Sequence, residues 1–143
     1  MTYAYTTLNL WAVAAALIVR QPIISEIVFV NSVAICTSFH CGLLLDWTAY
    51  DRLCQFNRCN RLTLASLNFS SHILPPIVMW YTVSNRDIDR ISGSISLIMH
   101  LLWVYVACGS FNLSDIYIKM HWFHWCVMWF VAIGTHLYVP VLM

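Results

Sequence analysis

Charged residues are scarce in this chain of 143 residues. Asp, Glu, Lys and Arg make up 9% of the sequence and hydrophobic residues 61%, whereas soluble domains average about 25% charged and about 45–50% apolar residues. This composition excludes a water-soluble globule. The formal net charge of +1 also leaves no acidic or basic surplus of the kind that binds nucleic acid. The sequence therefore predicts a membrane protein without a nucleic-acid partner.

Targeting and redox motifs are also absent. No Lys or Arg precedes the apolar run that begins at Leu10, so we expect neither a secretory signal peptide nor an Arg-rich transit peptide. The six cysteines include no C-x-x-C pair, which argues against a redox motif of that type. Only Cys54 and Cys59 share a polar segment, where they could form a disulfide in an oxidising compartment.

The charges fall in four places and leave five apolar stretches between them. A charge at the bilayer centre costs at least about 2.5–3.5 kcal/mol, so these stretches are predicted to be the spans. We predict an all-α polytopic membrane protein, a single domain over residues 1–143 with short loops. Its helices are expected at about 3–19, 23–46, 62–83, 91–112 and 120–140, since a span takes roughly 20 residues. The Lys and Arg residues divide three against four between the two sides, which leaves the orientation open.

Two connections have specific signals. Arg20-Gln21-Pro22 predicts a tight first turn, because Pro at the first position of a helix loses no hydrogen bond. The stretch from Asp46 to Arg61 carries several charges and is typical of a solvated connector.

Pro75-Pro76 interrupts the third predicted span. Each proline frees a backbone carbonyl four residues upstream, which must find another partner inside a membrane. One interpretation is a packing kink in which Ser70 or Ser71 supplies a hydroxyl. The other is a polar site at mid-membrane around Asn68 and His72, which share one helix face at i, i+4.

Histidines are the main chemical signal, because six of them lie in or at the ends of the predicted spans. Ionisable groups inside a bilayer commonly line bundle interiors or ion paths, although any one histidine is more simply a packing or interface residue. A proton path requires titratable groups strung through a wet seam. The candidates for such a path are Glu26, His40, Asp46, His72, His100 and His124.

Two cofactor alternatives use some of the same residues. A zinc site could be assembled from His40, His121 and His124, with Asp51 orienting a ligand and a water in the open position. That site would make the chain a membrane hydrolase acting on lipid amides or esters. A haem b would need axial histidines at similar depth on neighbouring helices, and His72 with His100 could supply them.

Part of the chain resembles subunit 6 of respiratory NADH dehydrogenase, a protein of five helices with short loops. The resemblance rests on Arg20-Gln21-Pro22 with Ser25, on Asp46-Trp47-Thr48-Ala49, and on Val131-Ala132-Ile133-Gly134-Thr135 in the last helix. The Tyr-Val-Gly-Ala-like stretch that supports a π-bulge in that family's third helix is not found between Asp46 and Trp80. The resemblance implies a place in a proton-pumping membrane arm.

A second resemblance is to zinc-dependent membrane hydrolases similar to alkaline ceramidase. Ser38-Phe39-His40 with Asp51 is similar to that family's Ser…His…Asp pattern, and His121-Trp122-Phe123-His124 to its terminal His pair. The terminal spacing is three residues instead of four, and Cys36 stands where the family has a serine. A haem-binding anchor subunit of succinate dehydrogenase has a similar His and Asp spacing, so His40 and Asp51 fit both families.

We expect, on balance, a small integral-membrane subunit of a respiratory-chain complex, most simply in the mitochondrial inner membrane. Its role would be structural and proton-conducting, without catalysis or a cofactor of its own. Its expected partners are other membrane subunits and structural lipids. The zinc hydrolase and the haem-anchoring subunit remain the alternatives.

Overall fold

The computed structural model describes residues 5–46, 48–110 and 122–142, and every regular element in these ranges is helical. The predicted all-α fold class is confirmed. The elements are α1 (Tyr5–Val19), α2 (Pro22–Leu45), α3 (Ala49–Asn57), α4 (Arg61–Asn68), the π-turn η1 (Phe69–Ile73), α5 (Leu74–Val83), α6 (Arg90–Ser110) and α8 (Trp122–Leu142). Where they are described, the five predicted helices match α1, α2, the continuous α4–η1–α5 helix, α6 and α8 to within a few residues.

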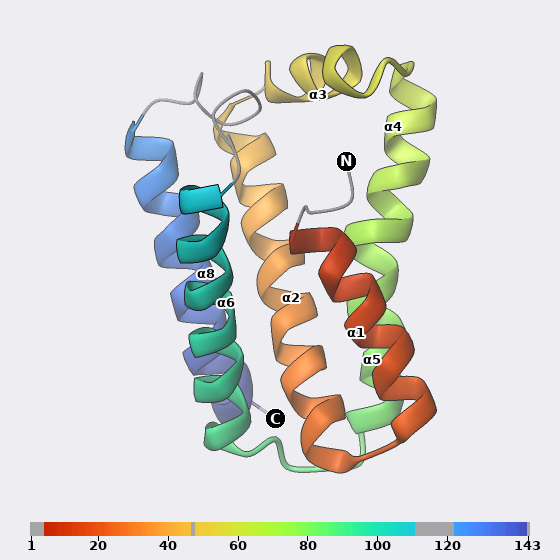
Figure 1. The fold of residues 1–143 in the computed structure, drawn as a ribbon, viewed down its shortest axis with the longest axis vertical. Coiled ribbons are helices and arrows are strands. Elements are labelled where there is room, and N and C mark those ends of the chain that lie inside the picture. The colour runs from red at the N-terminus through yellow and green to blue at the C-terminus, as the bar shows by residue number, and fades with distance from the viewer. Residues whose placement is uncertain (1–4, 47, 111–121, 143) are drawn as a thin grey trace.

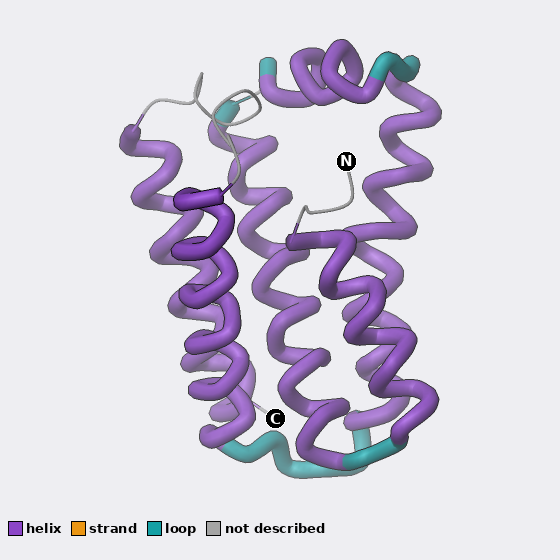
Figure 2. The backbone as a smooth tube through the Cα atoms, in the orientation of Figure 1, coloured by secondary structure: helices purple, strands orange, loops and turns teal. Residues whose placement is uncertain are grey.

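The long helix α2 lies in the middle of the bundle. It contacts α1 and α5 on one side and α6 and α8 on the other (Figure 1). The described connections between the long helices lie at the two ends of the bundle (Figure 2). A buried side chain of α2 therefore faces one of two groups of neighbours, and this division decides which candidate residues can meet.

The first turn forms as predicted. α1 ends before Arg20, which adopts a left-handed conformation with φ 54°, and its N–H still bonds the Ala16 carbonyl at 2.9 Å. Pro22 then opens α2. Next to this turn, Phe29, Val30, Met79 and Val83 from α2 and α5 are buried in the main apolar cluster.

The predicted solvated connector is not irregular throughout, because residues Ala49–Asn57 form the helix α3. This helix crosses the end of the bundle between α2 and α4 (Figure 1). Asn60 starts the next helix, since its side chain accepts a hydrogen bond from the Thr63 N–H at 2.8 Å. The charges of this segment lie at the end of α2, in or beside α3 and at the first residue of α4, and its helical content was missed.

The proline pair produces a π-turn within a continuous helix. The N–H of Leu74 bonds the carbonyl of Phe69, five residues back, because the two prolines that follow lack an N–H for the usual ladder. Ser70 and Ser71 both donate to the Leu67 carbonyl, at 3.0 and 2.6 Å. The serines therefore bond a carbonyl upstream of those that the prolines free.

Two helices in the described ranges, Pro22–Leu45 and Arg61–Val83, are long and apolar enough to cross a membrane by length and composition. Their mean hydropathy over 18 residues is 1.8 and 1.2. Two further apolar helical stretches, Thr6–Val19 and Cys126–Leu142, are shorter.

Candidate functional site

Glu26 is a buried carboxylate near the start of α2. Its residue is 8% exposed, and Oε2 accepts hydrogen bonds from the Ser92 hydroxyl at 2.8 Å and the Asp89 N–H at 3.2 Å. Both donors come from the beginning of α6 and the residue before it. Hydrogen bonds to a charged acceptor are among the stronger ones, so this contact joins α2 to α6 at one end of the bundle.

Polar side chains continue along α6 from this contact. Ser92, Ser96 and His100 follow one another at four-residue spacing, which puts them on one face of the helix. Ser92 and Ser96 are completely buried. Gly93 lets α8 come close to this face, because a Cβ at Gly93 would lie 2.5 Å from the His136 carbonyl oxygen. Ser96 Oγ has no hydrogen-bond partner within the described ranges.

Two histidines meet where this face touches α8. Nδ1 of His100 lies 3.1 Å from Nε2 of His136, with the rings edge to face at 88°. One of these nitrogens must carry the hydrogen and the other accept it. His136 is completely buried, and its Nδ1 has no partner in the part of the chain that the structure describes. We call Glu26, Ser92, Ser96, His100 and His136 the polar line.

A second polar cluster lies on the other side of α2, at the π-turn. The His72 ring stacks on Phe39 with centroids 3.8 Å apart. Ser71 Oγ is 2.9 Å from Nδ1 of His72, and Thr6 Oγ1 is 3.4 Å from Nε2. The expected polar site around His72 thus has polar contacts from two elements, α1 and η1.

His40 lies near this second cluster, one residue after Phe39. Its Nδ1 is 2.7 Å from the carbonyl oxygen of Cys36, one turn earlier in α2. Asn68, the expected partner of His72, is half-buried, and its Oδ1 lacks a hydrogen-bond partner among the described residues. The seam predicted from the sequence is therefore split, with His40 and His72 on one side of α2 and Glu26 and His100 on the other.

A third polar cluster, which the sequence interpretation missed, joins α1 to α2. Asn9 donates to Ser32 Oγ at 3.0 Å, and Asn31 donates to Asn9 Oδ1 at 2.8 Å. Asn9 and Ser32 are buried. A signal existed in the sequence, since Asn9 and Asn31 are strongly polar residues inside two of the predicted helices, but it did not reveal that these two residues face each other.

Asp46 and Asp51, at the α3 end of the bundle, form ion pairs. Arg52 donates to Asp46 through one nitrogen and to Thr48 through another. Hydrogen bonds from Arg52 and Thr48 hold the pKa of the Asp46 carboxyl below its ordinary value, against the opposing effect of burial. Arg61 reaches Asp51 at 2.7 Å. Both carboxylates are thereby engaged within the segment that links α2 to α4.

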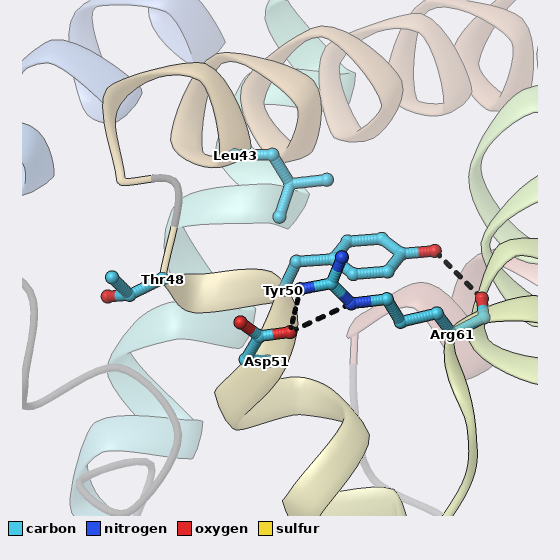
Figure 3. A pocket seen from close by; sticks show the side chains of 5 residues that line it. All are labelled: Leu43, Thr48, Tyr50, Asp51 and Arg61. Carbon is cyan, nitrogen blue, oxygen red and sulfur yellow. Dashed lines mark hydrogen bonds and ion pairs between the residues drawn. The ribbon is translucent and has the colours of Figure 1, made fainter.

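A pocket of about 430 Å³ opens beneath α3. Figure 3 shows Arg61 directed at Asp51, and Tyr50 bonded to the Arg61 carbonyl oxygen at 3.2 Å. Leu43 and Thr48 complete the lining that the figure shows. The Asp51 carboxylate and the Tyr50 hydroxyl are already hydrogen-bonded to Arg61. The lining therefore does not indicate which ligand, if any, the pocket would bind.

The zinc set is not brought together within the described ranges. Gly42 of α2 lies against Met128 of α8. His40 is two residues below Gly42 and His124 four residues above Met128, so the two histidines are offset by about 9 Å along the helices. Asp51 is bonded to Arg61, and His121 lies outside the described residues. No group of three His, Cys, Asp or Glu side chains within these ranges could hold a metal ion.

The haem pair is not brought together either. His72 belongs to η1 and His100 to α6, which lie on opposite sides of α2 (Figure 1). His100 instead meets His136, a histidine that the sequence interpretation assigned no role. The four-residue spacing of Ser92, Ser96 and His100 was the available signal, but it does not reveal which helix that face meets.

Comparisons do not add an assignment to this geometry. No family model, no curated protein and no solved structure matches the chain. What the chain does must therefore be argued from its own residues.

Proposed function

We propose that the chain is a membrane-embedded subunit of a larger energy-converting assembly and that its polar line carries protons. The observation behind this proposal is the polar line itself. A buried carboxylate, two buried serines and a pair of touching histidines follow one another at the interface of α2, α6 and α8. Buried polar groups are costly unless they are bonded, and inside a membrane they commonly mark ion paths.

The outer surface favours a membrane location. The α4–η1–α5 helix is apolar, yet only 17% of its most apolar 18 residues is buried within the bundle. Large apolar side chains are exposed on every long helix, including Trp11, Leu44, Tyr81, Tyr105 and Phe130. Soluble proteins rarely leave apolar patches of this extent in water. Lipid and neighbouring membrane subunits would cover them.

The charges favour the same location. Apart from Glu26, the charged residues in the described ranges lie at the two ends of the bundle, in or beside the α1–α2, α2–α4 and α5–α6 connections. This arrangement leaves the middle of every long helix without a formal charge. The polar line then begins at one membrane surface, beside Asp89, and ends at the His100–His136 pair. From Ser92 to His100 it rises about 12 Å along α6.

The residues of the line can relay a proton in sequence. A serine hydroxyl both donates and accepts, so Ser92 can pass a proton from the Glu26 carboxyl towards Ser96. We propose that water molecules hydrate Ser96 Oγ and His136 Nδ1, which have no partners within the described ranges. A proton that binds Nδ1 of His136 allows Nε2–H to pass to Nδ1 of His100. The His100 ring can then release a proton from its other nitrogen.

The membership of a complex is tested by native electrophoresis. The tagged chain, extracted in mild detergent from mitochondrial membranes, is expected to migrate with a far heavier species. Migration as a monomer would contradict the proposal. So would stoichiometric zinc in the purified chain, which would favour the hydrolase alternative, or a haem absorption band, which would favour the anchor alternative.

The proton role is tested separately in vesicles that contain the assembled complex. Glu26→Gln and Ser96→Ala are expected to slow proton uptake at least about tenfold, because a positioned proton-transfer group contributes about 100-fold or more. Ser94→Ala is the matched control, since Ser94 is exposed on the same helix and bonds the Arg90 carbonyl. Equal rates in all three variants, at equal complex content, would rule out the polar line as the path.

A further inference from the structure

Cys54 and Cys59 lie side by side because of the way α3 ends. The Arg58 residue adopts a left-handed conformation with φ 51°. The N–H of Cys59 bonds the Cys54 carbonyl at 3.0 Å, and that of Arg58 bonds the Gln55 carbonyl at 3.2 Å. This pair of hydrogen bonds is the Schellman motif, in which the side chain of the residue that accepts the longer-range bond commonly contacts the side chain of the residue after the left-handed one. Cysteines occupy both positions.

The side chains agree with this backbone arrangement. Both thiols are free and half-buried, and desolvation together with the neighbouring Cys59 raises the pKa of the Cys54 thiol. The pair lies in the segment between α2 and α4, at the end of the bundle opposite the α1–α2 turn (Figure 1). We propose that Cys54 and Cys59 form a reversible dithiol–disulfide site that reacts with small disulfides, such as oxidised glutathione, at this surface of the protein.

The reaction balances as two thiol–disulfide exchanges. One cysteine thiolate attacks a sulfur of oxidised glutathione, which forms a mixed disulfide and releases one glutathione thiolate. The second cysteine thiolate attacks the protein sulfur of that mixed disulfide and releases the second glutathione thiolate. Two protein thiols are oxidised, one glutathione disulfide is reduced to two glutathiones, and the two cysteine protons end on the released thiolates. Reduced glutathione in excess reverses both steps.

The sequence around the pair supplies a direct assay. Trypsin cleaves after Arg52, Arg58 and Arg61, so the two cysteines fall on different peptides, residues 53–58 and 59–61. The full chain in detergent is treated with oxidised glutathione, blocked with an alkylating reagent and digested. We expect the two peptides to be recovered joined, and to separate on reduction. We also expect about ten times more joined peptide than glutathione adduct, because the neighbouring thiol acts at millimolar or higher effective concentration.

Matched variants separate the folded geometry from mere closeness in sequence. Cys59→Ser should leave only the glutathione adduct on Cys54, whereas Cys126→Ser, which removes an exposed cysteine on α8, should leave the joined peptides unchanged. Variants at Arg58 lose the cleavage site between the cysteines, so their disulfide is detected as a single peptide, residues 53–61, that takes up alkylating reagent only after reduction. Arg58→Gly, which tolerates positive φ, should form this disulfide at the native rate, and Arg58→Val, which opposes positive φ, should form it more slowly. The proposal is overturned if the native chain yields adducts without joined peptides. It is also overturned if the chain unfolded in dodecyl sulfate joins as fast as the native one.

Discussion

The Glu26 carboxylate on α2 accepts a hydrogen bond from the Ser92 hydroxyl on α6 across 2.8 Å, between residues separated by 66 positions in the sequence. Both groups are buried. This bond fixes α6 against α2 at one end of the bundle and places the following polar residues of α6, Ser96 and His100, towards α8.

Removal of the Ser92 hydroxyl is expected to destabilise the fold. Ser92→Ala deletes one of two hydrogen bonds to a buried carboxylate and should cost about 1.5–3 kcal/mol, the range for bonds to charged groups. Ser94→Ala on the exposed side of α6 should change stability by about 0.5 kcal/mol or less. Equilibrium unfolding in mixed micelles, followed by circular dichroism, measures both. Equal losses for the two variants would contradict the assigned bond.

The two glycines at the α6–α8 side are expected to respond in opposite directions to the same substitution. A Cβ at Gly93 would lie 2.5 Å from the His136 carbonyl oxygen and 2.6 Å from Cγ of Pro140, so Gly93→Ala should cost about 1–3 kcal/mol. Nothing lies within 4 Å of a Cβ at Gly134. Gly134→Ala should therefore stabilise α8 by about 0.5–1 kcal/mol. The same unfolding assay distinguishes them, and a stable Gly93→Ala variant would show that the helices do not approach as described.

Acid is expected to weaken the α3 end of the bundle through Asp46. Bonds from Arg52 and Thr48 lower the pKa of this carboxyl from its ordinary value of 3.8. A carboxyl whose folded pKa is lowered adds stability above its unfolded pKa, and that stability is lost as pH falls through the folded pKa. Asp46→Asn should lower the free energy of unfolding by roughly 0.5–1 kcal/mol at neutral pH. It should also make the free energy of unfolding less dependent on pH below about pH 4. An unchanged profile in the variant would assign the acid sensitivity to another group.

Most of the fold could be predicted because the charges are few and placed between apolar runs. Each of the five long helices follows from that spacing, and Pro22 marks the start of α2 as expected. The helix α3 was missed because its charged residues suggested a connector, although a short helix with one polar face has the same composition. Pro75-Pro76 predicted a disturbance within the helix expected at 62–83, but not the π-turn through which that helix continues.

The candidate site could be predicted only in part, because helix periodicity does not reveal which helices meet. Glu26 and His100 were recognised as polar residues within spans, and both belong to the polar line. His136 and Ser96 could be identified as part of the polar line only from the packing of α8 against α6. His40 and His72 have the same sequence signals as His100, yet they lie on the other side of α2 from it.

The membrane proposal itself can be tested with two tryptophans. Trp11 is 72% exposed on the outside of α1, whereas Trp129 is half-buried beside the His100 ring, with centroids 5.7 Å apart. In bilayers whose acyl chains carry bromine, Trp11 should be strongly quenched, because it would face lipid. Trp11→Phe should therefore remove a larger share of the quenchable fluorescence than Trp129→Phe. If Trp11 instead responds to a water-soluble quencher such as acrylamide and not to the brominated lipid, its surface of α1 faces water and the proposed location is wrong.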